Sequence, residues 1–181
     1  MSLKKTIVSC ALLLATSLHG VYARDQFDRP SLEVPKAAAR LTVAFAEPEK
    51  WDGKRIDRTM QCRDLGGDKP ASPRLSVSGV PIDATSLVVF FANPRSYHNH
   101  GTFRVKEGRS EEAWTVPSIR SGAGDKLPKG IEIFDGGSTW GRAYNAPCPT
   151  AGSWLYTVTV YALDAEDKVL AIGEKDVGYA P

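Results

Sequence analysis

The chain has few of the residues that most catalytic and metal sites need. Its 181 residues include three cysteines and three histidines. It also lacks the short motifs of nucleophile turns (GxSxG), P-loops, zinc proteases (HExxH) and dinucleotide sites (GxGxxG before a helix). The 23 basic residues are nearly balanced by 21 acidic ones, so the excess of positive charge that nucleic-acid binding needs is missing. The sequence therefore predicts no nucleic-acid partner and no cofactor.

Residues 1–23 have the pattern of a secretory signal peptide. Two lysines precede an apolar run at 6–14, and Val21-Tyr22-Ala23 places small residues before an expected cleavage site at Arg24. The alternative is a membrane anchor, but the apolar run is shorter than the roughly 20 residues that span a bilayer. We therefore predict a periplasmic or secreted protein with no transmembrane segment after cleavage.

Two cysteines, Cys62 and Cys148, remain after the expected cleavage. In an oxidising compartment they are typical of a disulfide. The alternatives are a pair of buried thiols or a metal pair. No nearby CxxC motif or histidine supports a metal site.

The hydrophobic pattern predicts an all-β or β-rich domain at residues 41–181, preceded by an N-terminal arm at 24–40. The strongest strand signal is the aromatic and β-branched run at 154–163, which suits the middle of a sheet. Further strands are expected at 41–45, 86–92 and 114–116, with a weaker one at 55–62 that could pair with 41–45. Residues 63–74 read as a loop, and only 35–41 and 165–171 could form short helices.

Several motifs occur in the order found in one known family. They are WDGKRI at 51–56, QCRD at 61–64, SPRLSVSGVP at 72–81, AWTVPSI at 113–119, LPKG at 127–130, STWG at 138–141, and the PCP loop at 147–149 followed by YALD at 161–164. The chain thereby resembles the phosphatidylethanolamine-binding protein family over about residues 41–173, and is most similar to its bacterial Raf-kinase-inhibitor-like branch. The resemblance implies an antiparallel β-sandwich with few short helices.

The resemblance also implies a pocket that binds anionic groups such as phosphate or a phospholipid head group. In the family it is built from the first Asp of a DPD motif, the His of an HW motif, and a His two residues before an aromatic residue after the PCP loop. By this comparison Asn93 replaces the acid, Ala113 replaces the first His, and Trp154 replaces the second, whereas Tyr156 is kept. The changes remove both imidazoles that could donate to an oxyanion.

The remaining pocket should be aromatic with one amide, which suits an apolar or neutral ligand. We expect it to be lined by Asn93, Trp114, Tyr144, Trp154 and Tyr156. The alternative is that these aromatic side chains fill the former pocket.

His98 and His100 stand in a polar stretch, and on an extended backbone they would face the same side. Three interpretations stay open: a metal site, a contact to an anion, or a plain polar loop. Because the stretch between Asn93 and Trp114 is long, this loop could fold over the rim of the pocket and restore a donor.

Three functions remain as hypotheses. The first is an exported binding protein with an altered pocket for a small molecule or anion. The second is an interaction or inhibitor module for a protein partner, because the family is known for inhibiting kinases and proteases by surface contact. The third is a hydrolase that uses His98 or His100, but no nucleophile or acid partner is visible for either. We therefore predict a protein that is not an enzyme.

Overall fold

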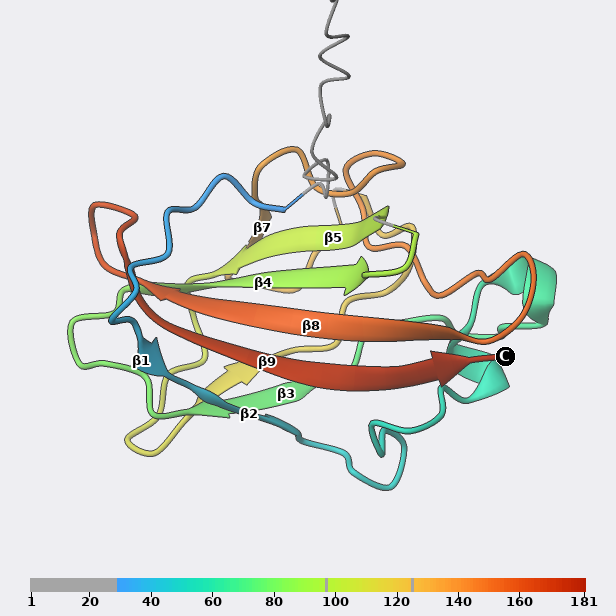
Figure 1. Ribbon diagram of the computed structural model, residues 1–181, viewed down its shortest axis with the longest axis horizontal. Coiled ribbons are helices and arrows are strands. Elements are labelled where there is room, and N and C mark those ends of the chain that lie inside the picture. The colour runs from blue at the N-terminus through green and yellow to red at the C-terminus, as the bar shows by residue number, and fades with distance from the viewer. Residues whose placement is uncertain (1–28, 97, 125) are drawn as a thin grey trace, which may run out of the picture.

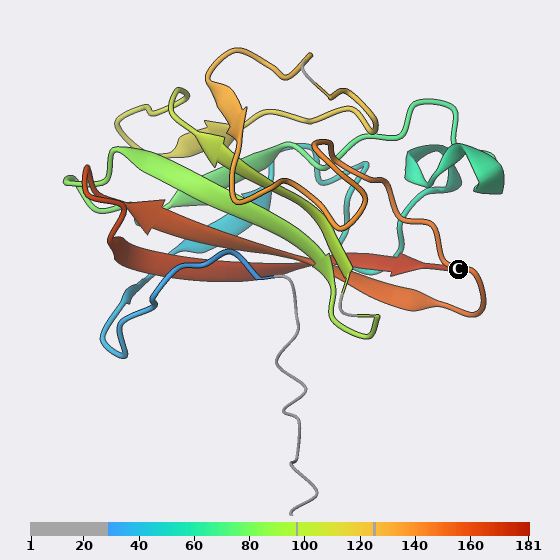
Figure 2. The same cartoon turned by 90° about the horizontal axis from the view of Figure 1, so that it is seen from above.

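The computed structural model describes residues 29–181 except 97 and 125, so the predicted signal peptide lies outside the described residues. Two β-sheets form the domain (Figures 1 and 2). The six-stranded sheet has the order β1 (Ala39–Arg40), β9 (Val169–Ala180), β8 (Trp154–Leu163), β4 (Ser86–Asn93), β5 (His98–Val105) and β7 (Ile131–Ile133). The three-stranded sheet has the order β2 (Thr42–Phe45), β3 (Leu75–Ser78) and β6 (Trp114–Val116). The predicted β-rich fold is confirmed.

The main core lies between the two sheets. It contains Val43, Val77 and Val116 from the three-stranded sheet and Leu87, Val89 and Val158 from the six-stranded one. Because side chains alternate along a strand, the intervening β4 residues, such as Val88 and Phe90, point to the opposite face, where Leu32 of the arm packs against them. This second cluster explains why the whole of β4 is buried and reads as one apolar run.

Strand β8 lies in the interior of the six-stranded sheet, as predicted from its sequence. It pairs antiparallel with β4 on one side and with β9 on the other. The predicted strands at 86–92 and 114–116 are also confirmed, as β4 and β6.

Truncating Val158 or Val160 to alanine should lower the free energy of unfolding by roughly 1–3 kcal/mol, because each loses apolar contact and leaves a cavity. Both side chains are fully buried in the core. Urea unfolding measures the change, and Val34→Ala is the matched control because Val34 is 41% exposed. An unchanged unfolding midpoint for both core variants would contradict the prediction that β8 is central to the stability of the sheet.

Three local predictions were wrong. Strand β2 pairs with β3 and not with residues 55–62, which instead carry the 3-10 helix η1 (Arg58–Met60), capped by the Asp57 side chain. Residues 35–41 form a turn and the short strand β1. Residues 165–171 form a turn and the start of β9, because the Asp164 carboxylate accepts from the backbone N–H groups of Glu166 and Lys168.

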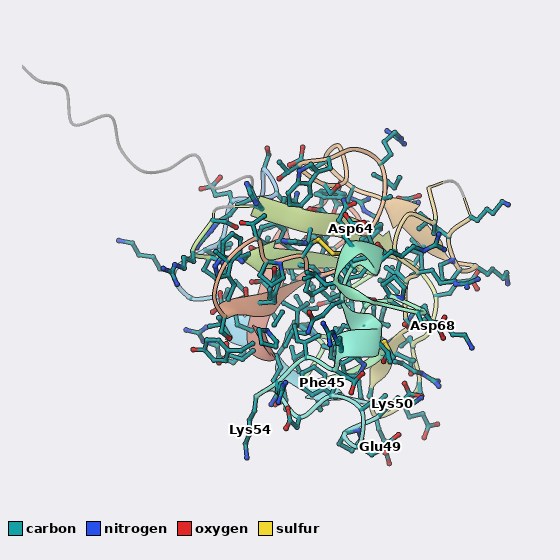
Figure 3. The ribbon with its side chains drawn as sticks, turned by 90° about the vertical axis from the view of Figure 1, so that its right-hand side faces the viewer. Phe45, Glu49, Lys50, Lys54, Asp64 and Asp68 are labelled. Carbon is teal, nitrogen blue, oxygen red and sulfur yellow. A yellow bond between two sulfur atoms is a disulfide. The ribbon has the colours of Figure 1, made fainter. Side chains whose placement is uncertain are left out.

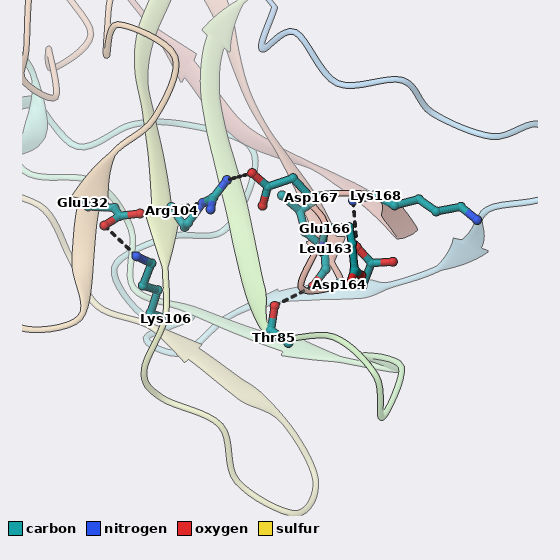
Figure 4. Close-up of polar contacts among 9 residues, drawn as sticks. All are labelled: Thr85, Arg104, Lys106, Glu132, Leu163, Asp164, Glu166, Asp167 and Lys168. Carbon is teal, nitrogen blue, oxygen red and sulfur yellow. Dashed lines mark hydrogen bonds and ion pairs between the residues drawn. The ribbon is translucent and has the colours of Figure 1, made fainter.

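Charged side chains hold the far end of β5 (Figure 4). Arg104 donates to Asp167 in the β8–β9 turn at 2.8 Å and stacks over the Phe134 ring. Lys106 pairs with Glu132 of the neighbouring β7 at 2.9 Å. These contacts fix β5 from its C-terminal end, and the opposite end of the same strand carries the two histidines.

Among the described residues, no helix is both long enough and apolar enough to span a membrane.

Candidate ligand-binding site

A disulfide joins Cys62 to Cys148, as predicted, with Cα atoms 5.2 Å apart. It lies beside the 3-10 helix η2 (Arg63–Leu65), which carries Asp64 (Figure 3). The Cys62 backbone N–H also donates to the carbonyl of Pro147 at 2.8 Å. The PCP loop is therefore fastened to the segment that carries the QCRD motif.

Asn93 ends strand β4 and organises the turn to β5. Its Oδ1 accepts from the backbone N–H groups of Arg95 and Ser96 at 2.9 and 3.1 Å. The side chain is fully buried, and its Nδ2 has no hydrogen-bond partner within the described part of the chain. Asn93 is not among the residues that line the cavity described below, so the structure gives it a role in the turn.

The polar stretch with His98 and His100 is a strand, and the prediction of a loop was wrong. Ala92 pairs with Asn99 and Phe91 pairs with Gly101, so His100 is the extra residue of a β-bulge. The Asn99 side chain stabilises the bulge by accepting from the Gly101 N–H and donating to Thr102. Gly101 has φ of 150°, and a Cβ there would collide with the Phe103 ring, so only glycine fits.

A cavity of about 310 Å³ opens where β5 and β8 meet the PCP loop. Its walls combine aromatic rings with smaller apolar and neutral polar groups. The lining residues are Cys62, His98, His100, Ser121, Trp140, Asn145, Ala146, Cys148, Thr150, Trp154 and Tyr156. None of these lining residues is a lysine, an arginine, an aspartate or a glutamate.

His100 forms the inner wall and is held by the backbone of Asn145. Its Nδ1 lies 2.8 Å from the Asn145 carbonyl oxygen, and the Asn145 N–H donates to the His100 carbonyl, also at 2.8 Å. Burial lowers the pKa of His100 to about 4, although the bond to Asn145 opposes the shift; nearby His98 lowers the pKa further. The imidazole is therefore neutral at neutral pH.

Trp140 covers both imidazoles from the outside. Its ring makes edge contacts with His98 at 4.8 Å and with His100 at 5.1 Å between centroids, while the side chain stays 55% exposed. The loop is held to β5 because Asn99 donates to the Thr139 hydroxyl and the Thr139 N–H donates to the Asn99 carbonyl, both at 2.9 Å.

Trp154 and Tyr156 line the cavity from β8, where two residues apart they share one face. Tyr156 packs edge-on against His100 at 4.9 Å between centroids. Burial raises the pKa of Tyr156. Tyr144 lies behind the cavity, packed against Phe91, and burial raises the pKa of its hydroxyl as well.

The structure thus brings together four of the seven predicted site residues, His98, His100, Trp154 and Tyr156. Trp114 does not line this cavity, because it lies in β6 of the other sheet, buried in the core beneath Arg109. Ala113 directly precedes β6 and does not line this cavity either. The strand that follows Asn93 is β5, and the imidazole in contact with Tyr156 is that of His100.

Sequence reasoning missed Trp140 and Asn145 as parts of the site. Trp140 stands in the STWG motif of a glycine-rich loop, and this motif was the available signal. The backbone contact of Asn145 has no signature in the sequence. Among the described residues, no group of three or more His, Cys, Asp or Glu is placed to hold a metal ion.

Fold and cavity together define the class of the molecule. It is a β-sandwich whose strand pairs are antiparallel except for β1 with β9, and it has a cavity with aromatic walls at one end of its larger sheet. The chain belongs to the phosphatidylethanolamine-binding protein family, whose profile matches residues 46–180. No curated protein sequence matches the chain.

Solved structures with this fold include two members of the same family. The crystal structure of Escherichia coli YbcL, described as a new member of the mammalian PEBP family, is 20% identical, with a TM-score of 0.54 over 78% of this chain and 98% of that one. A putative phosphatidylethanolamine-binding protein homologue, CT736 from Chlamydia trachomatis D/UW-3/CX, is 21% identical, with a TM-score of 0.52 over 78% of this chain and 97% of that one.

Proposed function

We propose that this chain is an exported member of the family that binds a small ligand in the aromatic cavity and catalyses no reaction. The observation that carries the proposal is the open cavity of about 310 Å³, which lies in the size range of small-molecule sites. An open cavity favours ligand binding over the alternative of a vestigial pocket filled by its own aromatic side chains. The signal-peptide pattern of residues 1–23 and the Cys62–Cys148 disulfide support export.

The lining residues argue against the family's anionic ligands. A buried anion needs charged or multiple donors to offset its desolvation. Here the inner imidazole is neutral, and Trp154 stands where the resemblance places a second histidine. We therefore expect phosphate and phosphoethanolamine to bind weakly or not at all near neutral pH.

The hydrolase alternative receives no support from the site. Among the described residues, the hydrogen-bond partner of His100 Nδ1 is a backbone carbonyl and not a carboxylate. Ser121 lines the cavity, but its hydroxyl accepts from the Ala146 N–H.

The neutral fluorescent probe N-phenyl-1-naphthylamine should bind saturably, at one molecule per chain, and phosphoethanolamine should not displace it. Thr150→Trp should abolish this binding because Thr150 lies exposed on the rim and the indole would occupy the opening. Thr42→Trp is the matched control because Thr42 is an exposed threonine on the three-stranded sheet. Absence of saturable binding, or equal binding by the Thr150→Trp variant, would contradict the proposal.

A further inference from the structure

The two contacts between His100 and Asn145 fix the imidazole tautomer. A carbonyl oxygen can only accept, so the bond from Nδ1 to the Asn145 carbonyl places the ring proton on Nδ1. The second contact, from the Asn145 N–H to the His100 carbonyl, holds the two backbones together. Nε2 is then left with a lone pair and acts as an acceptor.

This acceptor has no hydrogen-bond partner among the described residues, although the ring is only 4% exposed and lines the cavity. The titratable groups that face the ring are His98 on the same strand and Tyr156 on β8. Neither is a carboxylate that could stabilise an imidazolium. The inner wall therefore presents one fixed neutral acceptor.

Much of the remaining wall is made of flat aromatic rings. Trp140 closes the outer side against both imidazoles, and Trp154 and Tyr156 line the side formed by β8. Aromatic walls favour a planar apolar body that stacks or packs edge-on against them. On the inner wall, the unpaired acceptor of His100 can fix the orientation of such a ligand.

We propose that the cavity selects a small, neutral, planar molecule that donates an O–H or N–H group to Nε2 of His100. The inference rests on the proposed function, namely that this cavity is a binding site. Nε2 cannot hold an oxyanion, because the anion's oxygen would face its lone pair. The expected ligand therefore donates a hydrogen bond to the site, whereas an anion would have to accept one.

Phenol and anisole provide a matched pair of probes, because they share the ring and anisole lacks the O–H donor. Calorimetric titration near neutral pH should show phenol binding about tenfold more tightly, the effect of one buried hydrogen bond. His100→Leu should abolish the preference while anisole still binds, and Thr42→Leu, on the three-stranded sheet and away from the cavity, should retain it. Both variants are first checked for cooperative unfolding.

The nitrogen NMR signals of the histidines in the natural protein provide a second measurement that needs no variant. Phenol should shift the Nε2 signal of His100, and anisole should not. Equal affinity for both probes with no selective shift would overturn this inference and leave the proposed function intact. If neither probe binds and N-phenyl-1-naphthylamine also fails, the proposed function is overturned as well. Tighter binding of inorganic phosphate than of phenol would overturn the donor-ligand inference.

Discussion

Removing the Cys62–Cys148 disulfide should lower the free energy of unfolding by about 4 kcal/mol, because the bridge closes a long loop in the unfolded chain. The two cysteines are 86 positions apart in the sequence. The bridge also fastens the PCP loop, which follows directly on the Asn145 contact with His100. We therefore expect a loss of ligand affinity together with the loss of stability.

The measurement is urea unfolding of the natural protein and of a double variant, Cys62→Ala with Cys148→Ala. Reductant should destabilise the natural protein and have no effect on the double variant. Before reduction, the mature protein should show no titratable thiol after unfolding. Two thiols per mature chain, or equal stability of the two proteins, would contradict the account of the bridge.

Acid should destabilise the protein through His100 by about 3 kcal/mol in total. In the folded state the pKa of His100 is lowered to about 4 by burial, whereas in the unfolded chain it returns to 6.5. The unfolded state therefore takes up a proton first as the pH falls. The contribution of neutral His100 to the free energy of unfolding is complete above pH 6.5. It declines as the pH falls from 6.5 and is lost once the pH reaches about 4.

Urea unfolding is measured across this pH interval for the natural protein and for a His100→Gln variant. The comparison distinguishes the effect of His100 on stability from the effect of the carboxylates. The slope of stability against pH should be smaller in the variant than in the natural protein. Parallel slopes for the two proteins would show that His100 is not held neutral by burial.

The central strands could be predicted from the sequence because their local and tertiary preferences agree. Strand β8 carries aromatic and β-branched residues along its whole length, and β4 is a continuous apolar run because both its faces are covered. The two cysteines were equally informative, since an oxidising compartment leaves few other uses for such a pair.

Strands β5 and β9 were missed for a physical reason. Asn99 and Gly101 make the start of β5 look like a loop, but the bulge needs the glycine and the Asn99 side chain satisfies its backbone. The Ala165–Ala171 segment has a helix-like composition, yet the Asp164 side chain turns it into a hairpin that leads into β9.

The site itself depends on contacts between distant segments. Trp140 reaches the two histidines because Thr139 bonds to Asn99, 40 positions away in the sequence. Trp114 was assigned to the pocket from its neighbourhood in a sequence motif, and the sheet order places it in the other layer. Sequence patterns could identify the aromatic residues that were available, but not the sheet on which each would lie.

The most direct test of the central claim is a crystal structure of the mature protein grown with phenol. We predict an open cavity with planar density between Trp140 and Trp154, and a ligand oxygen about 3 Å from Nε2 of His100. Tetrahedral density of a phosphate or sulfate in contact with His100, or tryptophan rings that fill the cavity and exclude phenol, would contradict the account.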